Sequence, residues 1–242
     1  MTRKRADVVL VERGFFASRA RAQEAIAAGL VTVNGAAIRK ASDGVAADAA
    51  ITAEQPHPYV SRGGVKLAAA LDAFRIDPKG RICLDIGAST GGFTEVLLMR
   101  GAAHVYAVDV GHGQLHPKVA GDPRVTNLEG TDARSVNGEL IPQAADLLVS
   151  DVSFISLKLV LPATVALLRP PAELAVLVKP QFEAGRDHVK KGIVRDEAVH
   201  RAVCETMTAF VASLGFEIIG LVPSPIEGGD GNREFLLGAR RG

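Results

Sequence analysis

From residue 59 onward, short apolar runs alternate along the chain with segments of helical periodicity. The runs typical of strands read RICLDIG, HVYAVDV, RVTNLE, DLLVSD, ELAVLVK and FEIIGLVPS, and segments such as FTEVLLMRG and RAVCETMTAFVASLG lie between them. This alternation predicts a largely parallel β-sheet covered by helices on both faces. Ligands of such open sheets bind at the C-terminal ends of the strands. We therefore predict an α/β fold here, with its site among the residues that follow the strands.

Residues 1–57 follow a different pattern, which predicts a small α+β domain. Asp7 to Arg13 is a short helical segment, and Ser18 is a suitable N-cap for a second helix that ends at Gly29. LVTVNG predicts a strand entering an Asn34–Gly35 turn, and AIRKASDGV and AAITAE supply further short strands. This part therefore forms a unit of its own.

The prolines of QPHPY indicate the boundary between the two parts. We place a linker at residues 58–64 and the α/β domain at residues 65–242. A chain of 242 residues is long enough for one full domain and a small additional one.

Basic residues gather near the N-terminus. The first 40 residues hold eight basic and three acidic side chains, whereas the net charge of the whole chain is only +1. Such a surface can bind the phosphates of a nucleic acid, although a merely solvated face explains the charges as well. The candidate RNA contacts are Arg3, Lys4, Arg5, Arg19, Arg21 and Arg62.

Several classes of protein are disfavoured by the composition. Cys83 and Cys204 lie far apart inside apolar segments, so neither a disulfide framework nor a zinc site is expected, and the histidines show no metal spacing. The N-terminus lacks the apolar core of a signal peptide, and no run reaches the ~18 apolar residues of a membrane span. We expect a cytoplasmic, monomeric protein without a metal or a membrane contact.

The first strand of the α/β domain runs into a loop rich in glycine. The loop residues are Asp85, Gly87, Ala88, Ser89, Thr90, Gly91, Gly92 and Phe93. Glycines allow a sharp turn and close approach of a ligand, and the helix that follows directs free N–H groups towards it. The dinucleotide fingerprint G-x-G-x-x-G cannot be laid on this segment.

The loop is similar to the D-x-G-x-x-x-G-G loop of class I (Rossmann-like) methyltransferases, which use S-adenosylmethionine. Asp109 ends the second strand, where a carboxylate can accept the ribose hydroxyls of the cofactor. Asp132 follows the third strand, where the resemblance implies a contact with the adenine amino group. Strand-to-helix turns often need glycine, but the loop and both aspartates in the right order favour a cofactor site.

Charged residues also stand at the ends of later elements. Asp151 follows the fourth strand and Lys179 the fifth, Lys66 lies just before the domain core, and Glu234 lies at the final hairpin. An alcohol is a poor nucleophile at neutral pH, so methyl transfer to a hydroxyl needs a base or a charge that stabilises the alkoxide. Taken alone, Lys66, Asp151 and Glu234 could each be a surface charge or a helix cap. Lys179 differs, because a lysine between the apolar run ELAVLV and a proline is an unlikely purely structural choice.

Together these stretches resemble the TlyA family, often labelled hemolysin A. The matching segments are YVSRGGVKL, LDIGASTGGFT, VSDVSFISL, VKPQFE, KGIVRD and GNREFLL, and SRARAQEAIAAGLVTVNG is similar to the S4-type RNA-binding domain. The catalytic domain of that family is similar to FtsJ-type ribose 2′-O-methyltransferases, which use a Lys-Asp-Lys-Glu tetrad. Carried over, the tetrad is Lys66, Asp151, Lys179 and Glu234, and the implied substrate is a cytidine of ribosomal RNA or of ribosomal subunits.

In that scheme Lys179 activates the 2′-hydroxyl, Asp151 orients it, and Lys66 and Glu234 hold the arrangement. Three alternatives stay open. A base methyltransferase is disfavoured because SDVSF stands where amino-directed enzymes carry a double proline. A membrane-active haemolysin and a non-catalytic RNA-binding assembly factor are the other two.

Overall fold

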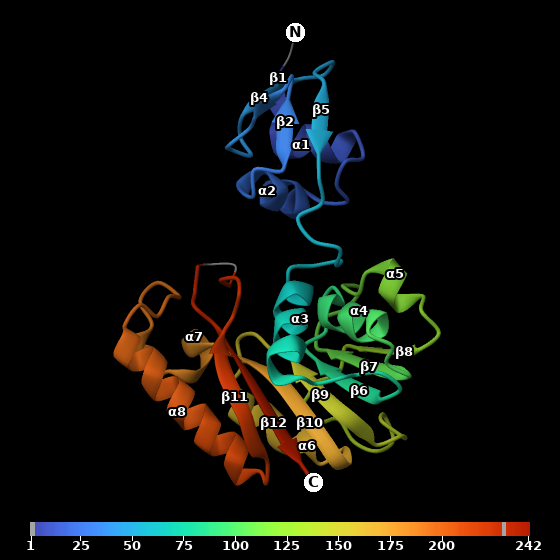
Figure 1. The fold of residues 1–242 in the computed structure, drawn as a ribbon, viewed down its shortest axis with the longest axis vertical. Coiled ribbons are helices and arrows are strands. Elements are labelled where there is room, and N and C mark those ends of the chain that lie inside the picture. Colours follow the sequence, from blue (N-terminus) through green and yellow to red (C-terminus); the bar gives the residue numbers. More distant parts are fainter. Residues whose placement is uncertain (1–2, 229–230) are drawn as a thin grey trace. The chain divides into compact units, whose positions relative to one another are not determined.

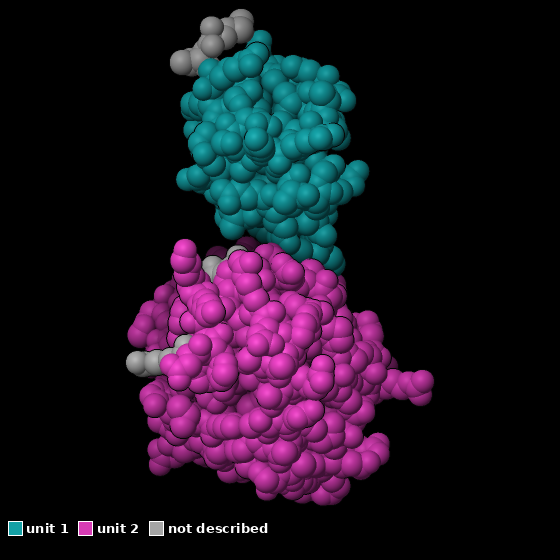
Figure 2. Space-filling model, turned by 90° about the vertical axis from the view of Figure 1, so that its left-hand side faces the viewer, with its two compact units in different colours: residues 1–58 teal, residues 59–242 magenta. Residues whose placement is uncertain are grey.

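The structure is a computed structural model that describes residues 3–228 and 231–242. It divides into two compact units, residues 1–58 and residues 59–242, which are coloured separately in Figure 2. The segment predicted as a linker includes Gly63 and Gly64, which form the start of a helix.

The first unit is a small α+β domain, as predicted. Its elements are β1 (Arg3–Arg5), α1 (Ala6–Glu12), α2 (Arg19–Ala27), β2 (Val31–Val33), β3 (Ala36–Ala37), β4 (Gly44–Ala46) and β5 (Ile51–Ala53). Strands β3, β2 and β5 form one antiparallel sheet, and β1 pairs with β4. Ser18 caps α2 by accepting a bond from the Arg21 amide, and Asn34 and Gly35 both have positive φ, as the predicted turn requires.

The second unit holds the sheet expected from the alternating pattern. Its elements are α3 (Gly63–Phe74), β6 (Ile82–Ile86), α4 (Gly92–Met99), β7 (His104–Asp109), α5 (Pro117–Ala120), β8 (Val125–Glu129), β9 (Ala145–Ser150), α6 (Leu157–Val165), β10 (Leu168–Val178), α7 (Pro180–Glu183), the short 3₁₀ helix η1 (Arg186–His188), α8 (Glu197–Ser213), β11 (Glu217–Pro223) and β12 (Phe235–Arg241). The strand order is β11-β12-β10-β9-β6-β7-β8. Only the pairs made by β12 are antiparallel, so the predicted α/β fold is confirmed.

Helices cover both faces of this sheet (Figure 1). Along β6, Cys83 faces the core shared with α3 and α4, while Leu84 and Ile86 face the core shared with α6 and α8. Each fully buried aliphatic side chain stabilises the fold by roughly 1.5–3 kcal/mol. The Phe74 ring of α3 packs directly on β12, because a Cβ at Gly238 would lie 2.4 Å from that ring. Strands β6, β7, β9 and β10 run parallel to one another, so their C-terminal ends share one edge of the sheet.

Candidate active site

The glycine-rich loop after β6 closes tightly against the end of β9. Gly87 has φ +83°, and a Cβ there would lie 2.8 Å from the carbonyl oxygen of Asp151. Gly91 has φ +91° and caps α4. Side chains at either position would strain the backbone or push the loop away from its neighbours. The two glycines therefore hold the loop beside Asp151.

Asp109 fixes the outer side of this loop. Its carboxylate accepts a bond from the Ser89 amide at 2.7 Å and another from the Gly111 amide at 2.7 Å. Each carboxylate oxygen has a second lone pair, so Asp109 can still accept hydroxyl groups of a ligand. The predicted ribose-binding carboxylate thus also orders the cofactor loop.

A cavity of about 460 Å³ opens at this edge of the sheet. Its walls include Gly87, Ser89, Val108, Asp109, Val110, Gln114, Thr131, Asp132, Ala133, Arg134, Asp151, Val152, Ser153, Phe154, Ile155 and Val160. A largely apolar cavity with a few carboxylates suits a nucleoside-sized ligand. The Asp132 carboxylate accepts bonds from the Arg134 guanidinium at 2.5 and 3.0 Å, which keeps the pKa of Asp132 low, at about 2.

Other predicted loop residues lie behind the cavity rather than in its wall. Ala88 and Phe93 are buried in the core under α3 and α4, and Thr90 is exposed. Gly92 is packed closely, since a Cβ there would lie 2.1 Å from the Ser61 hydroxyl. These positions shape the loop from inside.

Asp85 is fully buried at the base of the loop. Its Oδ2 accepts a bond from the Thr94 hydroxyl at 2.6 Å, while Oδ1 has no hydrogen-bond partner among the described residues. Burial raises the pKa of Asp85 to about 7, and the nearby Asp151 carboxylate adds to the rise. The side chain is thus poised between its neutral and charged forms near neutral pH.

The four charged residues predicted for catalysis meet at the same edge. Lys66 Nζ lies 2.6 Å from Glu234 Oε2 and 3.9 Å from Asp151 Oδ2, and Lys179 Nζ lies 2.5 Å from Asp151 Oδ1. They therefore form one chain of charges in the order Glu234, Lys66, Asp151, Lys179. Lys66, Lys179 and Glu234 expose only 8%, 7% and 4% of their surface. Burying charges this deeply is costly unless they are paired, and here each lysine lies against at least one carboxylate.

The elements explain how residues so distant in sequence converge. Lys66 points from the first half of α3, Asp151 follows β9, and Lys179 follows β10. Glu234 directly precedes β12, which pairs with β10. Asp151, an inner member of the chain of charges, also lines the cavity.

Two further residues of the site, Ser153 and Phe154, were not among the predicted site residues, although the segment SDVSF that contains them was noted. Lys179 Nζ donates a bond to the Ser153 hydroxyl at 2.9 Å. Phe154 has φ +65° and is 91% exposed, and its ring centroid lies 5.2 Å from that of Phe182. Its positive φ, which turns the ring outward, depends on the tertiary structure.

The basic residues of the first unit are organised around one carboxylate. Asp7 is completely buried, and it accepts bonds from Arg5 at 3.0 Å, from Arg19 at 2.9 Å and from Gln23 at 2.6 Å. The Arg5 guanidinium, with help from Gln23 and Arg19, holds the pKa of Asp7 far below its usual range. About half of each arginine side chain stays exposed.

The remaining candidate RNA contacts differ in their surroundings. Arg3 is exposed in β1, and Lys4 pairs with Glu12 at 2.8 Å. Arg21 donates to the Gln55 side chain and to the backbone oxygen of His57, both at 3.1 Å, so it also anchors the end of its unit. Arg62 belongs to the second unit and donates to the backbone oxygen of Glu227 at 2.7 Å.

Comparison with known proteins agrees with this architecture. The FtsJ-like methyltransferase family matches residues 59–241, and the S4 domain matches residues 4–51. The chain is 47% identical to YqxC of Bacillus subtilis, over 97% of this chain and 85% of that protein. It is 46% identical to the 16S/23S rRNA (cytidine-2′-O)-methyltransferase TlyA of Mycobacterium tuberculosis, over 98% of this chain and 90% of that protein.

A solved structure is similar over the whole chain. It is a protein from Streptococcus thermophilus that carries the name hemolysin, with 42% identity and a TM-score of 0.79, and the match covers 100% of this chain and 89% of that one. Sequence, fold and domain order thus agree. The chain belongs to the FtsJ-like methyltransferases with an S4 domain, in the group that contains TlyA and proteins named hemolysin.

Proposed function

We propose that this protein transfers a methyl group from S-adenosylmethionine to the ribose 2′-hydroxyl of a cytidine in ribosomal RNA. The observation that carries the proposal is the buried chain of charges from Glu234 to Lys179, which meets the cavity beside the glycine-rich loop at Asp151. A protein that only binds RNA has no use for two buried lysines at the edge of a nucleoside-sized cavity.

The cavity fits S-adenosylmethionine in size and in chemistry. Asp109 can accept the ribose hydroxyls of the cofactor, and Val110 and Ala133 offer apolar surface to its adenine. Asp132 lines the same cavity, and its carboxylate is paired with the guanidinium of Arg134. The cofactor, when bound, supplies an electrophilic methyl group. Gly87 and Ser89 lie where the loop would approach the cofactor most closely.

The protein's own residues would activate and hold the acceptor. Lys179 lies at the end of β10 with Asp151 on one side and Ser153 on the other, so its position is fixed. In this scheme Lys179 contacts the 2′-hydroxyl and promotes loss of its proton, and Asp151 orients the same oxygen. Lys66 pairs with both acids and so keeps Asp151 in place, and Glu234 fixes Lys66.

The substrate class rests on the first unit and on the relatives. An S4 domain with exposed Arg3, Arg5 and Arg19 provides donors for RNA phosphates. The name of TlyA of Mycobacterium tuberculosis specifies 16S and 23S rRNA as its substrates and cytidine-2′-O as the position methylated. With ribosomal RNA as its substrate, the proposed reaction is a cytoplasmic one.

The alternatives have less support. The segment after β9 contains no double proline, which disfavours a base amino group as the acceptor. Among the described residues, no helix is long and apolar enough to cross a membrane. The proteins named hemolysin share the family and its methyltransferase domain.

The test is transfer from labelled S-adenosylmethionine to purified ribosomal subunits and to naked ribosomal RNA, with the product nucleotide mapped. We expect 2′-O-methylcytidine that disappears with the Lys179→Ala variant. Label on a base would replace the ribose assignment by a base assignment. Cofactor binding without transfer to any ribosomal RNA would contradict the substrate class.

A further inference from the structure

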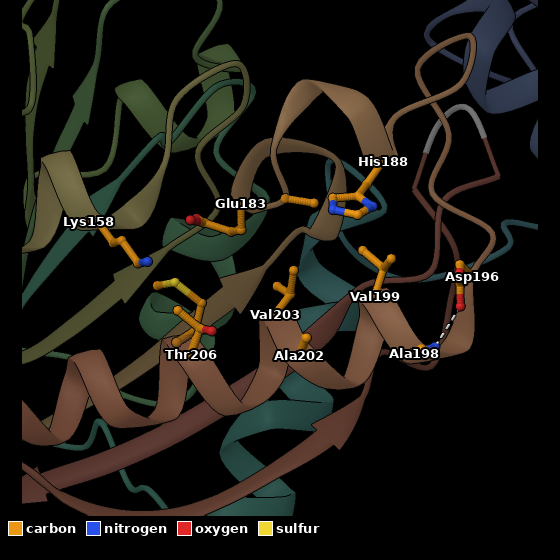
Figure 3. A pocket seen from close by; sticks show the side chains of 11 residues that line it. Lys158, Glu183, His188, Asp196, Ala198, Val199, Ala202, Val203 and Thr206 are labelled. Carbon is orange, nitrogen blue, oxygen red and sulfur yellow. Dashed lines mark hydrogen bonds between the residues drawn. The ribbon is translucent and has the colours of Figure 1, made fainter.

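A second cavity of about 460 Å³ lies between α8, α7 and the start of α6, and the proposed reaction does not use it (Figure 3). Its lining is Lys158, Glu183, Ala184, His188, Asp196, Ala198, Val199, Ala202, Val203, Thr206 and Met207. Three alanines account for much of the free space. Val199 and Val203 rise from α8 into the cavity, and Glu183 and His188 face them from the other wall (Figure 3).

One wall of this cavity is held rigidly. Glu183 accepts a bond from the Ser156 hydroxyl at 2.5 Å and another from the Leu157 amide at 2.8 Å, and so caps α6. The opposite wall is α8, whose first turn is capped by Asp196 through the Ala198 amide at 2.8 Å. The cavity is therefore formed before any ligand binds, and no large rearrangement is needed to fill it.

The lining indicates the chemical class of the ligand. The floor is apolar, with Met207 fully buried in it, and Val199 and Val203 offer its accessible apolar surface. The charged groups at the rim are two carboxylates, Glu183 and Asp196, and one lysine, Lys158, so the rim is acidic on balance. Such a rim offers no net attraction to a phosphate. It suits a flat, neutral heterocycle with donors and acceptors on its edge.

The cavity shares a short helix with the proposed reaction centre. Lys179 immediately precedes α7, and Glu183 at the end of α7 forms a wall of the cavity. Ser153 contacts Lys179, and Ser156 three residues later contacts Glu183. A single RNA strand with its target ribose at Lys179 therefore has a neighbouring nucleotide within reach.

We propose that this cavity binds an unstacked nucleobase of the RNA strand, adjacent to the target nucleotide. The inference rests on the proposed function for its substrate class. Proteins recognise single-stranded RNA by taking splayed bases into pockets where the ring packs on side chains and its edge is hydrogen-bonded. Here Val199 and Val203 supply the packing surface, and Glu183 and His188 supply groups for the edge.

A substitution that fills the cavity tests this site. Ala202 lines the cavity and is exposed, so Ala202→Leu fills the space and keeps a good helix former in α8. Ala209→Leu is the matched control, because Ala209 is exposed on the same helix outside the cavity. We expect Ala202→Leu to raise KM for an RNA fragment containing the mapped target about tenfold with little change in kcat, and Ala209→Leu to leave both unchanged.

The RNA supplies the second half of the test. Removing the base next to the target from the fragment is expected to weaken binding by wild-type protein about tenfold, and to have no further effect on the Ala202→Leu variant. Independent tenfold losses that multiply, or equal behaviour of the Ala202→Leu and Ala209→Leu variants, would overturn the proposal.

A signal that does not depend on catalysis separates the two proposals. The chain has three methionines, so a ¹³C-methyl methionine sample gives a resolved Met207 signal at the cavity floor, with Met99 on α4 as a reference. We expect the RNA fragment to shift the Met207 methyl and not that of Met99. A shift of the Met207 methyl without methyl transfer would contradict the proposed function and support the base-binding cavity. Methyl transfer without a Met207 shift would support the proposed function and contradict the base-binding cavity.

Discussion

The two units of this protein place their charges in opposite ways. In residues 1–58 one buried carboxylate, Asp7, holds two arginines whose side chains remain about half exposed. In residues 59–242 two lysines are themselves buried, and each is paired with an acid. The first arrangement offers cations to a ligand that arrives from solvent. The second fixes cations within a cleft, where small shifts in position change the chemistry.

The largest expected effect comes from removing one of the buried lysines, and it is on the rate of the reaction. Lys179→Ala should lower the rate of methyl transfer by on the order of 10³, because a positioned proton acceptor or charge contributes about 10²–10⁴. Cofactor affinity, measured by calorimetry, should stay nearly unchanged. Lys190→Ala, which removes an exposed lysine, is the matched control and should keep full activity. A comparable loss in both variants would contradict a specific role for Lys179.

The next effect is on stability and compares a buried pair with an exposed one. Lys66→Met leaves Glu234 buried without its partner and should cost about 3–5 kcal/mol in free energy of unfolding. Lys4→Met breaks the exposed pair with Glu12 and should cost less than about 1 kcal/mol. Urea unfolding of both variants gives the difference. The double variant Lys66→Met/Glu234→Gln should recover much of the loss, and failure to recover would mean that Lys66 acts through packing alone.

Two buried aspartates, one in each unit, are expected to make the stability of the two units depend on pH in opposite directions. In the folded state the pKa of Asp85 is about 7, above the ordinary value of about 3.9, so the stability it contributes is present below about pH 4 and is lost as pH rises through 7. The pKa of Asp7 is lowered, so its contribution is present above about pH 4 and is lost as pH falls below that value.

Each aspartate can be tested separately. Tyr59 and Tyr106, the two tyrosines of the chain, both lie in the second unit, so their near-ultraviolet signal follows that unit alone. Asp85→Asn should remove a loss in free energy of unfolding of about 4 kcal/mol between pH 4 and pH 7, as followed by that signal. Asp7→Asn should change the free energy of unfolding only below about pH 4, and the far-ultraviolet signal measures that change. A pH profile unchanged by Asp85→Asn would contradict the raised pKa.

The smallest effect distinguishes two arginines on one helix. Arg19→Gln should reduce the salt slope of RNA binding by about one, as expected for the loss of one phosphate contact. Arg21→Gln should also lower the melting temperature of the first unit, because Arg21 holds Gln55 and the His57 backbone. Arg201→Gln on α8 serves as a control of equal charge. An unchanged slope for Arg19→Gln would mean that its charge only solvates the surface.

Much of the fold could be predicted because local patterns and tertiary structure agree. The alternating runs predicted the strands of the large sheet, and Ser18 and the Asn34–Gly35 turn predicted the elements of the first unit. Strand β1 was missed, since three consecutive basic residues carry no alternation. It forms because Lys4 finds a partner strand at Val45. Lys66 was expected ahead of the core, yet α3 is part of it.

The candidate site was predictable in its members and not in its contacts. Strand ends indicated Asp151 and Lys179, and the family resemblance supplied Lys66 and Glu234. Their order as a single chain of charges depends on how α3 and β12 pack against β10. Asp7 gave no sign in the sequence that it would gather Arg5 and Arg19. Long-range packing of this kind is not encoded in any local pattern.

The position of Glu234 in the chain has a consequence for the timing of activity. It lies 168 residues after Lys66, immediately before β12, which is synthesised after the other described strands. A nascent chain therefore carries Lys66, Asp151 and Lys179 without their fourth member, and the β10 edge that β12 covers is still open. If ribosomal RNA is the substrate, the ribosome that makes this enzyme cannot be modified by it until Glu234 and β12 have been synthesised and the hairpin has docked.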